Sequence, residues 1–410
     1  MKILCVFGEH NYGDPARGTG YEYANFLPAF RRLGHEIVFF ESFSRVGYRD
    51  FAELNRRFLE TMERERPDLV FCVLMGYELW LETMALARRG TGAALVNWST
   101  DDSWKYPQFS RFIAPAFHLY ATTCSEACER AVQEGHDNFF LTQWAADGAK
   151  LAEPLPADKC RYQVSFVGSR YGNRSKWVKN LRDRGIEVTC FGHGWERGPV
   201  AAAEIPRIMR ESAISLNFGD SGLVLEGFKV RRSRQIKARI FEVPGAGGFL
   251  MTESAAHLED FFSLDREVAV FNGVDDLAAK IRYYLSHPPE RDAMARAGHG
   301  RIRAGHTYEH RLAPLLDRAR AVAVSQQAGN SRRPGIDWPA FERLESGHRR
   351  QNVMLRLLRA FLVVPAVLVW GPKRGPRAAR RLLFEACWRL AGRQTYSATG
   401  LPGRLFHGQS

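Results

Sequence analysis

The hydrophobic and polar positions of this chain alternate between short apolar runs and longer stretches with helical spacing. The apolar runs of the first part have the length of buried strands and cover residues 2–8, 35–41, 69–74, 94–98, 119–123 and 139–144. Between them, apolar residues recur three and four positions apart, as they do on one side of a helix. This alternation predicts a parallel α/β sheet of Rossmann type over residues 1–150.

The same alternation returns in the second part of the chain. Its predicted strands cover residues 162–167, 186–191, 214–218 and 249–251, and helices are expected over residues 205–211, 275–285 and 289–297. Residues 219–233 fit neither period and are expected to form a long loop. The pattern predicts a second Rossmann-like domain at 160–325, connected to the first by residues 145–159.

A glycine-rich loop, GDPARGTG, follows the first predicted strand. This loop resembles the glycine-rich first loop of GT-B enzymes, which implies that backbone N–H groups near Gly18 and Gly20 approach the donor phosphates or the acceptor. A tight turn before a helix explains the same residues. The loop lacks the full G-x-G-x-x-G pattern. A dinucleotide-dependent dehydrogenase is therefore not indicated.

The loop NWSTDDSW follows the fourth predicted strand. Ligands of open α/β sheets bind at the carboxyl ends of strands, so Asp101 and Asp102 are candidates for a general base or an acceptor contact. The alternative is that they cap the next helix. His118, beside the fifth predicted strand, is a weaker candidate, because a lone histidine there usually has a structural role.

Two segments of the second part are candidates for binding an anion. Gly168, Arg170 and Arg174 follow a strand and precede a helix, a context that suits a phosphate group, although a basic loop can also be simply solvated. On the helix predicted around residue 240, which is expected to end at Pro244, Arg239 and Glu242 are three residues apart and share one face. An arginine there can bind a diphosphate and a glutamate a ribose diol, unless the two form an ordinary surface ion pair.

Residues from 237 to about 312 resemble the CgeB-like (spore-maturation-type) glycosyltransferases, within the group 1 enzymes of GT-B fold. The matching segments, in order, are KARIFEVPGAGGFLMT, LEDFF, DDLAAKIRYYL, PERDAMARAG and HTYEHRL. The resemblance implies a nucleotide-sugar donor (UDP-, GDP- or dTDP-linked) held by the second domain in an interdomain cleft. It also implies an unknown acceptor, no cofactor and no bound metal. It adds Lys237 and Gly247 to the donor-binding residues.

The resemblance has one departure. Retaining group 1 enzymes usually carry a glutamate eight positions before the helix glutamate, and Arg234 stands there. The stereochemical course is therefore left open. A non-catalytic nucleotide-sugar-binding or scaffold protein on the same fold is the alternative to an enzyme.

The charge of the chain is concentrated at its C-terminal end. Of the net charge of +13, residues 326–410 carry +11, from 15 Lys and Arg against 4 Asp and Glu. A nearly neutral body gives no support to nucleic-acid binding. The scattered cysteines and the short N-terminal apolar run favour a cytoplasmic protein.

We expect a linker at 326–350 and a basic amphipathic tail at 351–410. Apolar and basic residues alternate over residues 351–393, which predicts attachment to an anionic membrane surface, such as the inner face of the cytoplasmic membrane. The longest charge-free run has 13 residues, too short to cross a bilayer as a helix. If the tail binds lipid, a chain cut after Gln326 should stay folded and active. The alternative is that the tail packs on the body.

Overall fold

The computed structural model describes residues 1–44, 46–226, 229–327, 335–350 and 353–407 of the 410-residue chain. For residues 221–233, 323 and 325–327 it describes no side chains. The chain forms two compact units. The first contains residues 1–122, 126–141 and 314–410, and the second contains residues 123–125 and 142–313.

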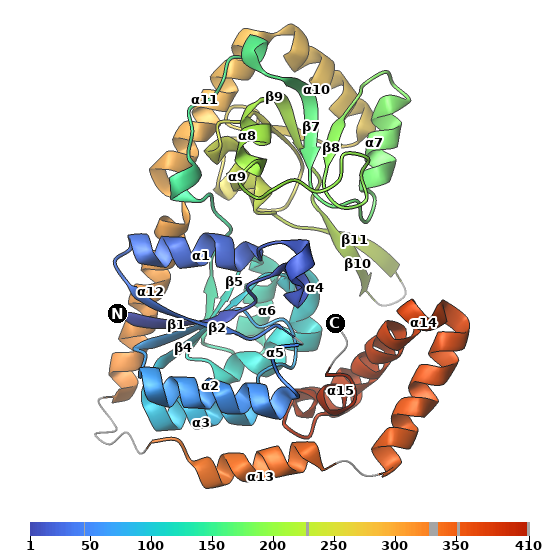
Figure 1. Ribbon diagram of the computed structural model, residues 1–410. Helices are drawn as coiled ribbons and strands as arrows, with labels where there is room; N and C mark the ends of the chain where they lie inside the picture. Colours follow the sequence, from blue (N-terminus) through green and yellow to red (C-terminus); the bar gives the residue numbers. More distant parts are fainter. Residues whose placement is uncertain (45, 227–228, 328–334, 351–352, 408–410) are drawn as a thin grey trace. The chain divides into compact units, whose positions relative to one another are not determined.

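The first unit is built on a six-stranded parallel sheet (Figure 1). In chain order its strands are β1 Lys2–Phe7, β2 Glu36–Glu41, β3 Leu69–Cys72, β4 Ala94–Ser99, β5 Leu119–Thr122 and β6 Phe139–Leu141. They lie in the order β2-β1-β3-β4-β5-β6. The helices packed on this sheet are α1 Tyr21–Arg32, α2 Phe51–Glu65, α3 Leu81–Thr91 and α6 Ser125–Gln133. All six predicted strands are confirmed.

The second unit has a five-stranded parallel sheet in the order β13-β12-β9-β7-β8. Its strands are β7 Tyr162–Val167, β8 Thr189–Phe191, β9 Ser212–Asn217, β12 Leu250–Glu253 and β13 Ala269–Phe271. Its helices are α7 Arg174–Arg182, α8 Ile205–Arg210, α9 Arg239–Gly245, α10 Val274–Ser286 and α11 Pro288–Gly305. The three-residue strand β13 was not predicted, because so short an apolar run has no readable period.

The strand order places a topological switch point in each sheet. In the first sheet the chain leaves β1 for β2 on one side and later returns to β3 on the other. In the second sheet β7 lies between β8 and β9 in the same way. Loops that follow the strands on either side of such a point diverge and leave a crevice at the carboxyl edge. The predicted loops after β1 and β7 both lie at these positions.

Two local predictions in the second unit were wrong. Residues 219–233, expected as a loop, contain an antiparallel hairpin of β10 Asp220–Glu226 and β11 Lys229–Arg234. Pairing with each other satisfies the backbone of both strands, although their charged composition hides the strand period. The helix α9 also includes Pro244 instead of ending before it.

The expectation of a linker at 326–350 is also corrected, because residues 338–349 form the helix α13, Trp338–Arg349. Phe341 is fully buried in the core of the first unit, where its ring stacks on Trp80 at a centroid distance of 6.2 Å. Arg56 on α2 binds Glu345 on α13 through both Nε and Nη2. Apolar burial and this ion pair hold α13 against α2. Residues 328–334 of the expected linker lie outside the described residues.

The C-terminal region also packs on the first unit. It comprises α14 Val353–Ala391, the 3-10 turn Gly392–Tyr396 and α15 Leu401–Leu405. Tyr396 is fully buried, and its hydroxyl donates to the carbonyl oxygen of Gln108. Ala398 belongs to the same hydrophobic core. Because the cut would remove Phe341, Tyr396 and Ala398 from that core, the structure leads us to expect that a chain cut after Gln326 loses its fold, contrary to the expectation from the sequence.

Candidate active site

Two arginines meet at the switch point of the second sheet. Gly168 directly follows β7, and a Cβ atom built on it would lie 3.2 Å from Nη2 of Arg239 and 3.4 Å from Nη1 of Arg174. Both guanidinium groups also lie over the ring of Phe166, at 5.6 Å for Arg239 and 5.2 Å for Arg174. The first residue of α7 and the first residue of α9 thus converge on one point at the carboxyl end of β7.

Arg174 is held rigidly in this position. Its guanidinium donates to the carbonyl oxygen of Ser169 at 2.8 Å and to the hydroxyl of Tyr171 at 2.9 Å. The side chain is buried, and its Nε has no hydrogen-bond partner within the described part of the chain. Burial, with the charge of Arg239 second, lowers the pKa of Arg174 to about 10. The fold therefore keeps at this edge a positive charge that its surroundings destabilise.

Arg239 shares that environment. Its Nε is buried and without a partner among the described residues. Neither Arg239 nor Arg174 forms an ion pair with a described carboxylate, although the charge of Asp220 partly offsets the repulsion at Arg174. Two adjacent cations with unused donors have the chemistry to bind an anion, and a diphosphate carries the charge that would match them.

Glu242 and Lys237 lie close to this pair in the sequence and on the same segment. Glu242 is one turn after Arg239 on α9 and is half-buried, as is Lys237 just before the helix. The structure therefore confirms the helical neighbourhood of Arg239 and Glu242 that the spacing predicted. A carboxylate one turn after Arg239 has the oxygen acceptors that a diol next to bound phosphates would need.

Arg170 and Gly247 have other surroundings. The Nε of Arg170 donates to the hydroxyl of Ser175 at 2.7 Å, and its guanidinium lies 5.5 Å from the ring centre of Trp195. At Gly247, where φ is +83°, a Cβ atom would come within 2.4 Å of the carbonyl oxygen of Ala152. Gly247 thus has a structural reason to be glycine, and Arg170 lies beside Trp195 rather than at the arginine pair.

The glycine-rich loop of the first unit lies at the switch point of its sheet. Gly20 is the residue before α1, and a Cβ atom there would lie 2.9 Å from the carbonyl oxygen of Gly8. Gly18 has a φ of +77°, which favours glycine. Glu41, at the end of β2, accepts from the backbone N–H groups of Glu9, Phe43 and Ser44. Because these bonds occupy Glu41, it is not available to a ribose, in keeping with the exclusion of a dinucleotide site.

The two aspartates after β4 have different roles. Asp102 is buried and accepts hydrogen bonds from the hydroxyls of Ser99, at 2.6 Å, and Ser110. Burial raises its pKa, against the effect of these hydroxyls. Asp101 is half-buried at the carboxyl end of β4, where its backbone carbonyl begins α4, Asp102–Lys105. Only Asp101 remains placed for contact with a substrate.

His118 lies at the opposite edge of the first sheet. It directly precedes β5, so it stands at the amino end of that strand, while ligands bind at the carboxyl ends. The ring is buried, and its Nδ1 accepts from the backbone N–H of Leu95 at 2.8 Å. This position corrects the sequence-based candidate, and we assign His118 a structural role.

Comparison with known proteins adds a family and a fold. Residues 170–317 match the model of a family described as glycosyl transferase-like, and this range contains Arg174, Arg239 and Glu242. A search of curated protein sequences finds no match.

Three solved structures share the arrangement of the chain. AviGT4, a glycosyltransferase involved in avilamycin A biosynthesis, is 14% identical with a TM-score of 0.52, over 79% of this chain and 98% of AviGT4. HepE from Anabaena, solved with UDP and glucose, is 14% identical with a TM-score of 0.53, over 77% and 99% of the two chains. Sucrose-phosphate synthase from Thermosynechococcus elongatus is 10% identical with a TM-score of 0.53, over 80% of this chain and 98% of the synthase. The likeness shows a shared fold, and the family match gives the class. The protein is a glycosyltransferase of the GT-B fold.

Arg234, which stands where retaining group 1 enzymes usually carry a glutamate, forms an ion pair in this glycosyltransferase. The Nε of Arg234 lies 3.1 Å from a carboxylate oxygen of Glu253, a buried residue at the end of β12. The other oxygen of Glu253 accepts from the backbone N–H of Gly219 at 3.0 Å. The cation at this position is thus neutralised by a carboxylate from another strand, and it does not add a third free charge to the arginine pair.

One residue of interest in the glycosyltransferase escaped the sequence analysis. Glu22 lies in the first turn of α1, directly after Gly20. Burial raises its pKa, and the charge of Asp101 raises it further, while Lys105 opposes the shift. These three groups therefore gather at the carboxyl edge of the first sheet. A glutamate just after a glycine-rich loop was the available signal.

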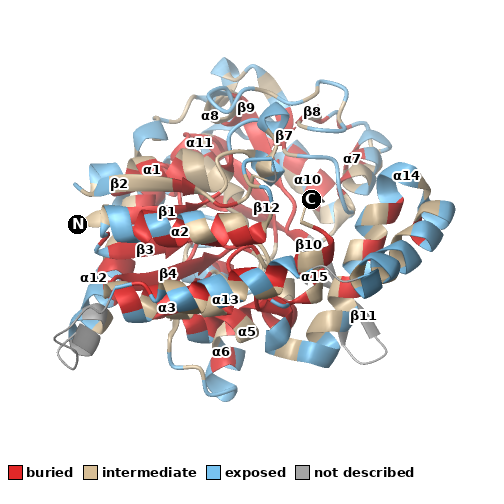
Figure 2. Cartoon of the chain, turned by 60° about the horizontal axis from the view of Figure 1, so that its bottom comes forward, coloured by how far each residue is buried: buried red, intermediate tan, exposed pale blue. Residues whose placement is uncertain are grey.

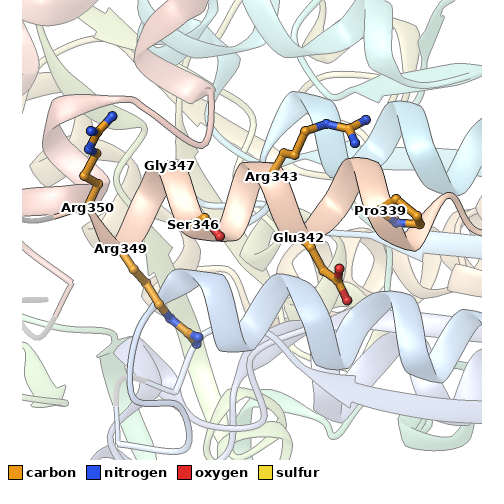
Figure 3. A pocket seen from close by; sticks show the side chains of 7 residues that line it. All are labelled: Pro339, Glu342, Arg343, Ser346, Gly347, Arg349 and Arg350. Carbon is orange, nitrogen blue, oxygen red and sulfur yellow. The ribbon is translucent and has the colours of Figure 1, made fainter.

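A surface groove runs along α13 of the enzyme, and none of the residues of the two edges just described lines it (Figure 3). Every residue that lines it belongs to α13 or directly follows it, and the set is Pro339, Glu342, Arg343, Ser346, Gly347, Arg349 and Arg350. Arg349 is already bound to Asp50 and Glu345. The groove is therefore a feature of the packed α13 surface and not part of the site.

Proposed function

We propose that the enzyme transfers a sugar from a UDP-linked donor, with the diphosphate bound by Arg174 and Arg239 and the ribose by Glu242. The observation that carries this proposal is the meeting of two arginines at Gly168 with unused donors. Bound diphosphate would offset the burial and, second to it, the repulsion from Arg239 that lower the pKa of Arg174. The choice of UDP is supported by the HepE structures, which hold UDP and UDP-glucose. GDP- and dTDP-linked donors fit the same phosphate contacts.

The arginine pair also supplies the chemistry of the leaving group. Negative charge on the diphosphate grows as the bond to the sugar breaks, so fixed cations stabilise the transition state more than the bound donor. The proposed reaction therefore proceeds without a bound metal ion. On the acceptor side, Asp101 is the candidate to accept the proton of the attacking hydroxyl, with Glu22 beside it.

The CgeB-like subtype is part of this proposal. It is supported by the ordered motifs between residues 237 and 312, of which the structure places the first on the segment that contains α9. A non-catalytic nucleotide-sugar-binding protein would keep the same arginine pair. Release of UDP from UDP-glucose, with or without an added acceptor, separates the enzyme from that alternative.

The decisive experiment measures UDP binding by calorimetry in buffer containing EDTA. Arg174→Gln combined with Arg239→Gln removes two charge-assisted contacts, each of about 1.5–3 kcal/mol, so affinity should fall by more than about 100-fold. Uridine binding should change far less, because uridine carries no phosphate. Arg182→Gln is the matched control, since Arg182 lies on α7 and pairs with Glu187 at 3.5 Å.

Unchanged UDP affinity in the folded double variant would refute the assignment. Loss of UDP binding in EDTA by the wild-type protein would instead refute metal independence.

We also propose a cytoplasmic location with peripheral attachment to an anionic membrane surface through the C-terminal region. The excess positive charge of residues 326–410 supports this attachment.

A further inference from the structure

The first arm of α14 exposes a continuous apolar stripe. Residues 353–370 form this arm, and Gly371, with φ 76° and ψ 170°, breaks the helix after it. Large side chains that recur three and four residues apart are 56–81% exposed, namely Met354, Leu357, Phe361, Val364 and Leu368. Exposed residues dominate both arms of α14 in Figure 2. Such a continuous stripe on one helix marks an interaction surface rather than scattered surface residues.

The opposite side of the same arm is covered. After the break the chain folds back, and the second arm, residues 372–391, lies against the first (Figure 1). A Cβ atom on Gly375 would come within 2.5 Å of the Cα atom of Val367, so the arms touch backbone to backbone. Ala366, Ala379 and Leu383 are buried in this contact, together with Leu405 and Phe406. The first arm thus carries apolar side chains on two faces, and only one of these faces is covered.

The hairpin is fixed to the first unit rather than hanging from it. Phe384 on the second arm contacts the ring of Tyr77 at 6.1 Å and that of Tyr396 at 6.3 Å. Tyr396 in turn packs on Phe109 and binds the carbonyl oxygen of Gln108. The stripe therefore has a defined place on the folded enzyme.

Charge identifies the partner. Residues 351–393 contain nine Lys and Arg and one acidic residue, Glu385. A second copy of this chain would bring two such basic regions together and be repelled. An anionic lipid leaflet instead offers acyl chains for the apolar stripe and negative headgroups for the basic side chains.

The geometry favours lying in the leaflet over crossing it. By length and composition, the segment from Val353 to Tyr396 is long and apolar enough to be a candidate span, and it is the one such helix in the described part of the chain. However, the first arm has 18 residues, about 27 Å as a helix, and the second arm, tightly packed on it, carries six basic side chains. A crossing first arm would draw those charges into the hydrocarbon core.

We propose that the α14 hairpin is the membrane-docking element of this enzyme. The stripe of Met354, Leu357, Phe361, Val364 and Leu368 inserts among the acyl chains of an anionic leaflet, and the basic residues of the second arm stay at the headgroups. This inference deepens the peripheral attachment proposed above by naming the inserted face. It narrows the sequence-based expectation, which assigned the contact to the whole of residues 351–393.

The test is co-sedimentation of the full-length protein with vesicles of phosphatidylcholine alone or with phosphatidylglycerol. Wild-type protein should pellet with the anionic vesicles and remain largely bound in about 1 M salt, where charges are screened beyond about 3 Å. In the triple variant Leu357→Ser, Phe361→Ser, Leu368→Ser, binding to anionic vesicles in high salt should be at least about tenfold weaker than in the wild type. These side chains are exposed, so the fold should survive.

Two further variants separate charge from insertion. Lys373→Gln, Arg374→Gln, Arg377→Gln, all at exposed positions, should reduce binding at low salt at least severalfold. Val132→Ser, Leu141→Ser, Val324→Ser removes equally exposed apolar side chains of the first unit elsewhere and should bind like wild type.

Three outcomes would overturn the proposal. They are wild-type protein that ignores anionic vesicles at low salt, a stripe variant that pellets like wild type, and a stripe variant that instead dissociates a dimer in light scattering. UDP binding, measured on the same preparations, should be equal in all variants. If wild-type protein binds lipid but not UDP, the donor assignment fails and the docking element stands.

Discussion

The carboxyl edges of the two sheets share a topology and differ in chemistry. In each sheet the strand next to one edge strand, β1 or β7, is the point at which the order of the strands reverses. A glycine-containing loop follows that strand in both sheets. The edge of the second unit gathers Arg174 and Arg239, whereas that of the first gathers Glu22 and Asp101 with Lys105. Under the proposed function, one architecture presents cations to an anionic donor and carboxylates to a hydroxyl acceptor. The strand order fixes where a ligand binds, and the side chains on the loops decide which one.

The two edges also differ in what supports them. Hydrogen bonds that Arg174 donates to the carbonyl oxygen of Ser169 and the hydroxyl of Tyr171 hold the arginine edge within its own unit. The carboxyl edge of the first sheet, called the acceptor edge below, is in contact with the C-terminal region. The hydroxyl of Tyr396 donates to the carbonyl oxygen of Gln108, which follows β4 and α4 in the chain. The first unit is therefore the one that depends on distant sequence.

Removing residues 327–410 should have the largest effect. The cut deletes the buried Phe341 and Tyr396, and each large aromatic loss in a core costs about 3–5 kcal/mol, against a typical total stability of 5–15 kcal/mol. We expect an insoluble or largely unfolded chain, judged by circular dichroism and thermal melting. A cut chain that melts cooperatively at the wild-type temperature would show that the acceptor edge does not need this cover.

Glu242→Ala should have the next largest effect and act on the arginine edge alone. Loss of one or two charge-assisted hydrogen bonds to the ribose should weaken UDP binding by at least about tenfold. Binding of inorganic pyrophosphate should be nearly unchanged, because it has no ribose. Calorimetry with both ligands makes the comparison, and an equal loss for both would place Glu242 at the phosphates instead.

Asp101→Asn and Asp102→Asn should separate chemistry from structure at the acceptor edge. If Asp101 takes the acceptor proton, Asp101→Asn should lower kcat by about 100-fold or more, with UDP affinity and melting temperature unchanged. Asp102→Asn should leave UDP affinity unchanged and alter stability instead. UDP-release kinetics and thermal melting distinguish the two, and a kcat loss confined to Asp102→Asn would exchange their roles.

The pH dependence of Asp102 should give the smallest effect. Its pKa in the folded protein is raised from the ordinary value of 3.8, chiefly by burial. A raised pKa means that the folded state binds the proton more tightly than the unfolded chain. The stabilisation is therefore full below pH 3.8 and is lost as pH rises through the folded-state pKa. Urea unfolding at several pH values should show this loss in the wild type and not in Asp102→Asn. Equal slopes for the two proteins would contradict it.

Local sequence was sufficient for most of the fold and for half of the site. Apolar runs predicted all six strands of the first sheet, most clearly β3, β4 and β5, because a strand buried on both faces has few polar positions. The three-residue spacing placed Arg239 and Glu242 on one helix. The loop after β7 contained Arg174, because its position between a strand and a helix is itself a sequence pattern.

Tertiary structure decided the rest, because it brings together residues that no local pattern relates. Only the sheet shows that His118 stands at the amino end of its strand and that Asp102 is enclosed by Ser99 and Ser110. The ion pair between Arg234 and Glu253 joins residues that are 19 positions apart and lie on different strands. The C-terminal region reads as a basic tail from its composition, yet burial of Tyr396 against residues nearly 290 positions earlier makes it part of the first unit. Composition records which side chains a segment carries, whereas burial depends on which surfaces the folded chain brings together.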